Sequence, residues 1–156
     1  MRLLIFLLCL LFSVSVFAQE LKVGKVYNDI KIGNLAGNRN LAFGFTNILE
    51  EVIQDQGYYL NPFSDNELTV NILFFDVIKN NLTVGVYGRK VDVYTVIVRA
   101  QLLKNGKKVR TVTAKSTSRS ISTSTIVLDQ GGKFSQASVS NAIKKVCEQL
   151  INKLKL

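Results

Sequence analysis

The sequence predicts an α+β two-layer sandwich, in which a four-stranded antiparallel sheet carries two helices on one face. Two segments repeat their apolar residues at three- and four-residue spacing, as amphipathic helices do. The segments between them alternate apolar and polar residues, as strands do, and Asn105-Gly106 joins two of these segments in a tight hairpin. The predicted order is therefore β-α-β-β-β-α. Strands grouped between two amphipathic helices favour an antiparallel sheet with both helices on one side.

The first half of the domain begins with a predicted strand at residues 21–32, followed by a loop rich in glycine and asparagine. Asn38 or Asn40 can act as the N-cap of a helix that runs to about Gln56. Gly57 then ends the helix, because glycine adopts a left-handed conformation at low cost. The apolar positions of this helix are Leu41, Phe45, Ile48, Leu49, Val52 and Ile53.

Two further strands are predicted at residues 68–78 and 89–103, with a turn beginning at Asn80-Asn81. On the first of them, alternation places four apolar side chains on the core face. They are Leu68, Val70, Ile72 and Phe74.

The strand after the Asn-Gly hairpin starts at Lys108 and runs into a Ser/Thr tract at residues 116–125. Lys115 and Arg119 among these hydroxyls favour an edge strand, where charges deter unwanted pairing, over a polar strip for a glycan or phosphate. Ser135 or Ser138 opens the final helix. Its apolar stripe is Val139, Ile143, Val146, Leu150 and Leu154, with Cys147 and Ile151 at the edge.

Residues 1–18 have the pattern of a secretory signal peptide. Arg2 supplies the positive charge, residues 3–12 form a short apolar run, and small residues precede a cleavage site after Ala18. We therefore expect an exported protein, periplasmic or secreted, with one α+β domain at residues 19–156.

The cysteines support two further expectations about the exported chain. Leu8 stands before Cys9, where a lipoprotein signal has a small residue, so lipid anchoring is not expected. Cys147 remains alone after cleavage, which excludes a disulfide within the chain, and its helical neighbours favour burial.

Residue types limit the chemistry that this chain can perform. The absence of histidine excludes Ser-His and Cys-His nucleophile pairs and imidazole-ligated zinc. The strand carboxylates Asp76 and Asp92 form the one plausible acid/base pair, and solvated strand-end carboxylates are the favoured interpretation. No enzymatic activity, catalytic residue, metal or cofactor is expected.

The chain is basic, with 20 Lys and Arg against 11 Asp and Glu and a net charge of +9. Ordinary solubility accounts for scattered charge, but the residues near the hairpin are also candidates for contact with an anionic membrane surface or lipid. They are Lys104, Lys107, Lys108 and Arg110. No aromatic residues interleave them, so a nucleic-acid partner is not expected.

A second apolar face is the most informative feature for function. Leu73, Phe75, Val77, Val93 and Ile97 project away from the face assigned to the helices. A sheet with one solvated face has cleaner alternation. Either a partner covers this face, such as a second copy, another envelope protein or a lipid, or the core face is misassigned for one strand.

The chain resembles small bacterial envelope proteins of the YajG and LptE kind, in which a signal peptide precedes strand, helix, three antiparallel strands and a closing helix. The resembling parts are Gln56-Gly57-Tyr58 at the helix end, residues 67–76, residues 88–110 and the last helix. The resemblance implies a non-enzymatic accessory role in the periplasm near the outer membrane. The amino-terminal domains of TolB-like and CsgG-like envelope proteins have a similar layout.

The expected function is thus that of an accessory protein that binds a partner in an envelope assembly. The alternative is a periplasmic carrier that holds a lipid or another apolar ligand between the sheet and the helices.

Overall fold

The computed structural model describes residues 19–30, 40–84, 87–124 and 135–155, which contain seven helices and strands. The expected signal peptide and most of the loop after the first strand lie outside these residues. The elements are β1 (Glu20–Asn28), α2 (Ala42–Asp55), β2 (Tyr59–Leu60), β3 (Asn66–Val84), β4 (Tyr87–Lys104), β5 (Lys107–Ser124) and α3 (Gln136–Leu154).

The strands form one five-stranded mixed sheet in the order β2-β1-β3-β4-β5. Strands β3, β4 and β5 are antiparallel neighbours joined by hairpins, as predicted. The prediction of four wholly antiparallel strands is wrong, because β1 runs parallel to β3 and to the short strand β2. Helix α2 lies between β1 and β3 in the chain, and a helical crossover returns the chain in a parallel direction.

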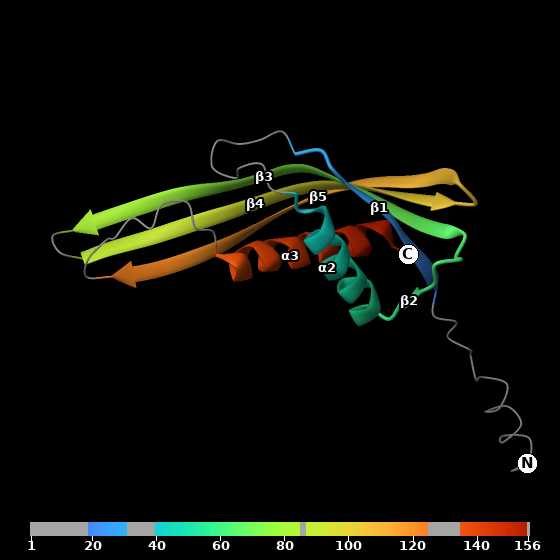
Figure 1. Cartoon of the computed structure of the whole chain (residues 1–156), viewed down its shortest axis with the longest axis horizontal. Coiled ribbons are helices and arrows are strands. Elements are labelled where there is room, and N and C mark those ends of the chain that lie inside the picture. Colours follow the sequence, from blue (N-terminus) through green and yellow to red (C-terminus); the bar gives the residue numbers. More distant parts are fainter. Residues whose placement is uncertain (1–18, 31–39, 85–86, 125–134, 156) are drawn as a thin grey trace, which may run out of the picture.

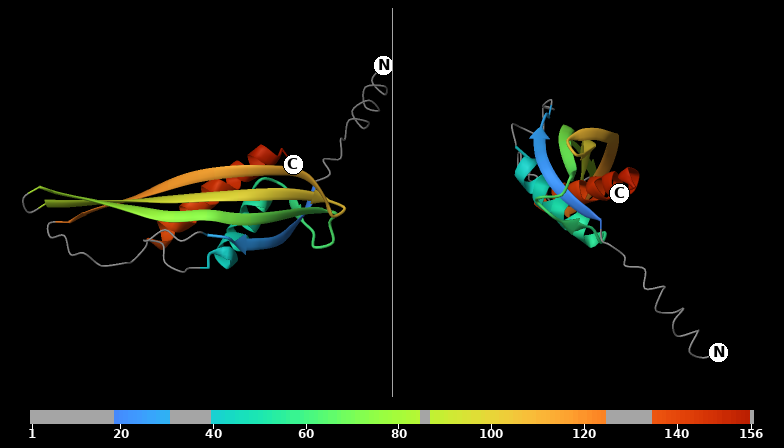
Figure 2. Two further views of the ribbon diagram at one scale, coloured as in Figure 1. Left: turned by 90° about the horizontal axis from the view of Figure 1, so that it is seen from above. Right: turned by 90° about the vertical axis from the view of Figure 1, so that its right-hand side faces the viewer.

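Both helices lie on the same face of the sheet, which confirms the predicted two-layer arrangement (Figure 1). A single apolar core fills the space between the layers and includes side chains from α2, α3 and four of the strands. Beyond the helices, the hairpin of β3 and β4 and the end of β5 continue as a long extension (Figure 2).

Helix α2 matches its predicted span closely. The side-chain oxygen of Asn40 accepts a hydrogen bond from the backbone N–H of Ala42 at 2.9 Å, which satisfies one donor at the start of the helix. Gly57 has φ +84°, the left-handed conformation expected of a helix terminator. The buried residues of α2 are Phe45, Leu49, Val52 and Ile53.

Helix α3 begins after Ser135, whose hydroxyl oxygen accepts the backbone N–H of Ser138 at 3.3 Å. The predicted apolar stripe faces the core, and Cys147 is buried within it, as expected. Burial, and to a lesser extent the charge of Glu148, raises the pKa of the Cys147 thiol above its ordinary value.

The two hairpins differ in how well the sequence predicts them. Asn105 and Gly106 both have positive φ, 50° and 71°, as a type I′ turn requires. The predicted turn at Asn80-Asn81 is wrong, because both residues pair with β4 and β3 continues to Val84. Pairing along a long neighbouring strand here outweighs the turn preference of asparagine.

Candidate docking surface

A bulge in β3 decides which side chains face the helices. The pairing with β4 shifts between Ile72 and Phe74, which leaves Leu73 as the extra residue. Because side chains alternate along a strand, one extra residue exchanges the two faces beyond it. Before the bulge the core residues are Leu68, Val70 and Ile72, and after it they are Phe75 and Val77.

The assignment of Phe75 and Val77 to a docking face is therefore wrong. Their side chains are 2% and 0% exposed and belong to the core. The second interpretation of the sequence, that the core face was misassigned for one strand, holds for the part of β3 beyond the bulge. Its signal lay in the unbroken apolar run 72–75, which interrupts the alternation.

Val93 and Ile97 lie on the face that points away from the helices, and both are half-buried, as is Leu73 at the bulge. Ile97 is opposite Phe74, and Val93 is opposite Ile78. Cross-strand apolar neighbours of this kind form a continuous surface.

We call the apolar residues of this face the outer strip. Ile78 and Ile121 are its most exposed members, at 53% and 55%. Val91 is opposite Ile121 on β5, which extends the strip toward the end of the sheet. The outer strip consists of Phe74, Ile78, Val91, Val93, Ile97 and Ile121. Both described helices, α2 and α3, lie on the opposite face of the sheet (Figure 1).

The charge on the same face is strongly positive. Asp76 is the carboxylate beside the strip, and one of its oxygens accepts the backbone N–H of Val77 at 2.8 Å. Glu67, on the same face before the bulge, forms a salt bridge with Lys22 at 3.3 Å. The cations are exposed and surround the strip on β4 and β5. They are Arg89, Arg99, Lys115 and Arg119. This face thus offers apolar contact inside a cationic border.

The basic residues predicted at the β4–β5 hairpin do not act as one group. Lys104, Lys107 and Lys108 are exposed at or beside the turn. Arg110 instead donates from its guanidinium to the carbonyl of Leu154, at the last turn of α3. Arg110 therefore provides a hydrogen-bond donor to a carbonyl at the C-terminal end of α3. The sequence pattern did not reveal this structural role.

The carboxylates Asp76 and Asp92 lie on opposite faces of the sheet. Asp76 is opposite Thr95 on the outer face, whereas Asp92 is buried on the helix-facing side. One oxygen of Asp92 lies 3.8 Å from the ammonium of Lys90. The sheet therefore separates the two groups, and they cannot share a substrate.

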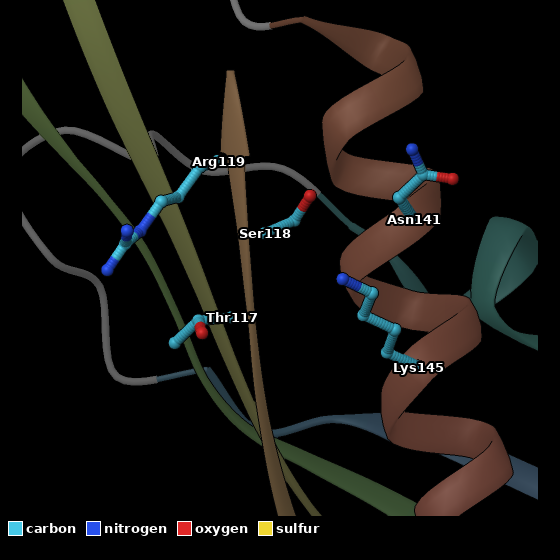
Figure 3. Close-up of a pocket in the computed structure, with 5 residues that line it drawn as sticks. All are labelled: Thr117, Ser118, Arg119, Asn141 and Lys145. Carbon is cyan, nitrogen blue, oxygen red and sulfur yellow. The ribbon is translucent and has the colours of Figure 1, made fainter. Parts of the chain in front are cut away.

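The edge strand β5 borders an open cleft of about 630 Å³ beside α3. The described residues that line it are Thr117, Ser118 and Arg119 of β5 and Asn141 and Lys145 of α3. Figure 3 shows Lys145 directed from the helix toward β5, while Arg119 extends from the other side of the strand. The sequence tract predicted to form an edge strand therefore also forms one wall of this cleft.

No protein-family model matches the sequence, and no curated protein matches it. Among the described residues, no helix has the combination of length and apolar character that crossing a membrane requires.

Solved structures of several bacterial proteins have a fold similar to that of this chain. A minor lipoprotein from Acinetobacter baumannii superposes with a TM-score of 0.53 at 9% identity, over 88% of this chain and 92% of that chain. A hypothetical protein from Chlamydia trachomatis gives a TM-score of 0.53 at 8% identity, over 88% and 95%. A protein from Xanthomonas campestris assigned to DUF330 gives 0.52 at 14% identity, over 87% and 80%. At these identities the likeness is one of fold, and it extends over most of each chain.

Proposed function

We propose that this chain is an exported, non-enzymatic accessory protein of the bacterial envelope, which binds a protein partner through the outer strip. The observation that carries this proposal is the composition of that face. Its apolar side chains lie in register across β3, β4 and β5, and both helices pack on the opposite side. Exposed apolar patches bordered by polar residues are typical of protein interaction sites.

The envelope location rests on two independent features. The leader at residues 1–18 has the pattern of a secretory signal. One of the proteins with a similar fold is described as a minor lipoprotein, which is an envelope-attached class.

The charges of the outer face favour a different protein over a second copy. Two copies placed face to face bring the positive outer face of one copy, with Arg99, Lys115 and Arg119, against the positive face of the other. Like charges across a contact oppose association, whereas an acidic partner neutralises them. The partner that fits is therefore acidic around an apolar centre.

A non-catalytic role agrees with the separation of Asp76 and Asp92 by the sheet. The alternative role as a lipid carrier gains no support from the described core. Side chains of the sheet and the helices contact one another there, where a ligand would have to lie.

Charge insertion on the outer strip tests the proposal. Val93→Glu and Ile97→Glu place a carboxylate in its centre, and Val109→Glu is the matched control, since Val109 is 62% exposed on β5 close to the hairpin. Each variant is expressed in cells that make the protein, and the membrane fraction is analysed by quantitative mass spectrometry before and after a high-salt wash.

We expect the wild type and Val109→Glu to recover the same defined set of proteins, and both strip variants to lose it. Thermal unfolding of each purified variant verifies that the domain is folded. Recovery of the same proteins by folded Val93→Glu and Ile97→Glu would contradict docking through the outer strip.

A further inference from the structure

Strand β5 ends the sheet, and among the described residues it pairs with β4 on one side only. The backbone groups on its other side are available to another strand wherever nothing else contacts them. Whether another part of the domain contacts these backbone groups differs along the length of β5.

Near the hairpin, α3 occupies the edge. The ammonium of Lys153 donates to the backbone carbonyl of Thr113 at 2.9 Å, which indicates that this carbonyl points away from β4. Alternate residues of a strand direct their N–H and C=O groups to the same side. Lys115, Thr117 and Arg119 therefore direct their backbone groups to the free edge as well.

Farther along, the cleft between β5 and α3 opens beside this edge (Figure 3). Thr117 and Arg119, whose backbone groups point to the free edge by this alternation, are two of its lining residues. An extended segment that enters the cleft can therefore form backbone hydrogen bonds with β5 and become a sixth strand.

The charges beside this edge select the side chains of such a segment. Side chains of an added strand point alternately to the two faces of the sheet. Those on the helix side lie near Lys145, and those on the outer side lie near Lys115 and Arg119. None of these three cations forms a salt bridge with another described residue. Carboxylates on both faces of the added strand fit this arrangement. A second copy of β5 does not, because it brings Lys115 and Arg119 of two copies together.

We propose that the β5 edge at Thr117–Arg119 binds an extended acidic segment of a partner protein by strand addition. This proposal extends the proposed function and rests on it, because strand addition also requires a protein partner. The two sites share Lys115 and Arg119 at their border, but the outer strip is a face of the sheet and this site is the backbone edge of β5. Substitutions of Val93 and of Thr117 therefore test them separately.

Photo-crosslinking in cells identifies what occupies the edge. Benzoylphenylalanine replaces Thr117, and in a separate variant it replaces Thr111, which has the same backbone orientation but lies outside the cleft. We expect the probe at position 117 to crosslink to an acid-rich segment of another protein and the probe at position 111 not to do so. Crosslinks only to a second copy, only to lipid, or to nothing would overturn the proposal.

Proline substitutions then test the mode of binding, with a synthetic peptide of the crosslinked segment as the probe. Thr117→Pro removes a backbone donor from the free edge and leaves the pairing with β4 intact, because an edge strand tolerates proline where its N–H points outward. We expect Thr117→Pro to weaken peptide binding about tenfold or more, and the control Thr111→Pro to leave it within about twofold. Circular dichroism verifies that both variants are folded.

Lys145→Ala should weaken the same peptide by about three- to tenfold, since it removes a charge that faces the added strand. Lys107→Ala, which removes an equal charge at the distant hairpin, is the control. Unchanged binding in folded Thr117→Pro would overturn strand addition, even if Val93→Glu still abolishes partner capture. If Thr117→Pro weakens peptide binding but Val93→Glu leaves partner capture unchanged, docking through the outer strip is overturned and strand addition is supported.

Discussion

The hydroxyl of Ser116 donates a hydrogen bond to the backbone carbonyl of Ala142, which connects the edge strand β5 to α3. Ser116 is buried, and its neighbours on the same face of β5 are Ala114 and Ser118, which are also buried. This contact holds the wall of the cleft against the helix that forms its other side.

Ser116→Ala should therefore lower the free energy of unfolding by about 1 kcal/mol, the net value of a typical internal hydrogen bond. The carbonyl of Ala142 is within a helix and retains its backbone donor, so no buried group is left without a partner. Urea unfolding gives the difference. Thr117→Ala, at the exposed neighbouring position, should change the free energy by less than about 0.5 kcal/mol. Equal effects at both positions would contradict a specific role for the Ser116 hydroxyl.

The bulge in β3 predicts opposite outcomes at two adjacent phenylalanines. Phe75→Ala removes a core side chain and should cost about 3–5 kcal/mol in the free energy of unfolding. Phe74→Ala removes a side chain from the outer face and should lower the free energy of unfolding by about 1 kcal/mol. Uninterrupted alternation from Leu68 predicts the reverse order. Denaturant unfolding of the two variants distinguishes the two registers, and a larger loss at Phe74 would show that the bulge is absent.

Two glycines of the first helical region should respond in opposite directions to the same substitution. Gly57 has φ +84°, so Gly57→Ala forces a side chain into the left-handed region and should destabilise the domain by about 1 kcal/mol. Gly44 lies within α2, and an added methyl group meets no atom within 4 Å. Gly44→Ala should stabilise the domain by about 0.5–1 kcal/mol, because alanine favours the helix. Thermal unfolding of both variants tests the pair, and a shift of the same sign in both would contradict the assigned helix end.

Cys147 should make the domain less stable in alkaline solution. Burial raises the pKa of its thiol in the folded state above the ordinary value of 9.0 that it regains on unfolding. Below that ordinary value the thiol is protonated in both states and pH has no effect through this group. Above it the unfolded state releases a proton that the folded state retains, so the free energy of unfolding falls as pH rises.

The measurement compares urea unfolding of the wild type and Cys147→Ala at about pH 8 and at about pH 10. Lysine titration is common to both proteins and cancels in the difference. The stability advantage of the wild type should shrink at the higher pH. An advantage that stays constant, or rapid reaction of the folded protein with a thiol reagent, would contradict the burial of Cys147.

Elements with local signals can be predicted from the sequence. The three- and four-residue spacing from Leu41 to Ile53 predicts α2, and the stripe from Val139 to Leu154 predicts α3. Asn105-Gly106 predicts the hairpin between β4 and β5, since both residues accept positive φ. Lys115 and Arg119 within the Ser/Thr tract predict the edge strand.

Features that depend on which segments pair could not be predicted from local patterns. The parallel direction of β1 follows from its contact with β3 across α2, and the two-residue strand β2 exists only because β1 is beside it. The bulge at Leu73 moved Phe75 and Val77 from the predicted docking face to the core, because one unpaired residue exchanges the faces of everything beyond it. The outer strip and the cleft beside Thr117 likewise combine residues from separate elements, and distances between such residues are set by packing and not by spacing in the chain.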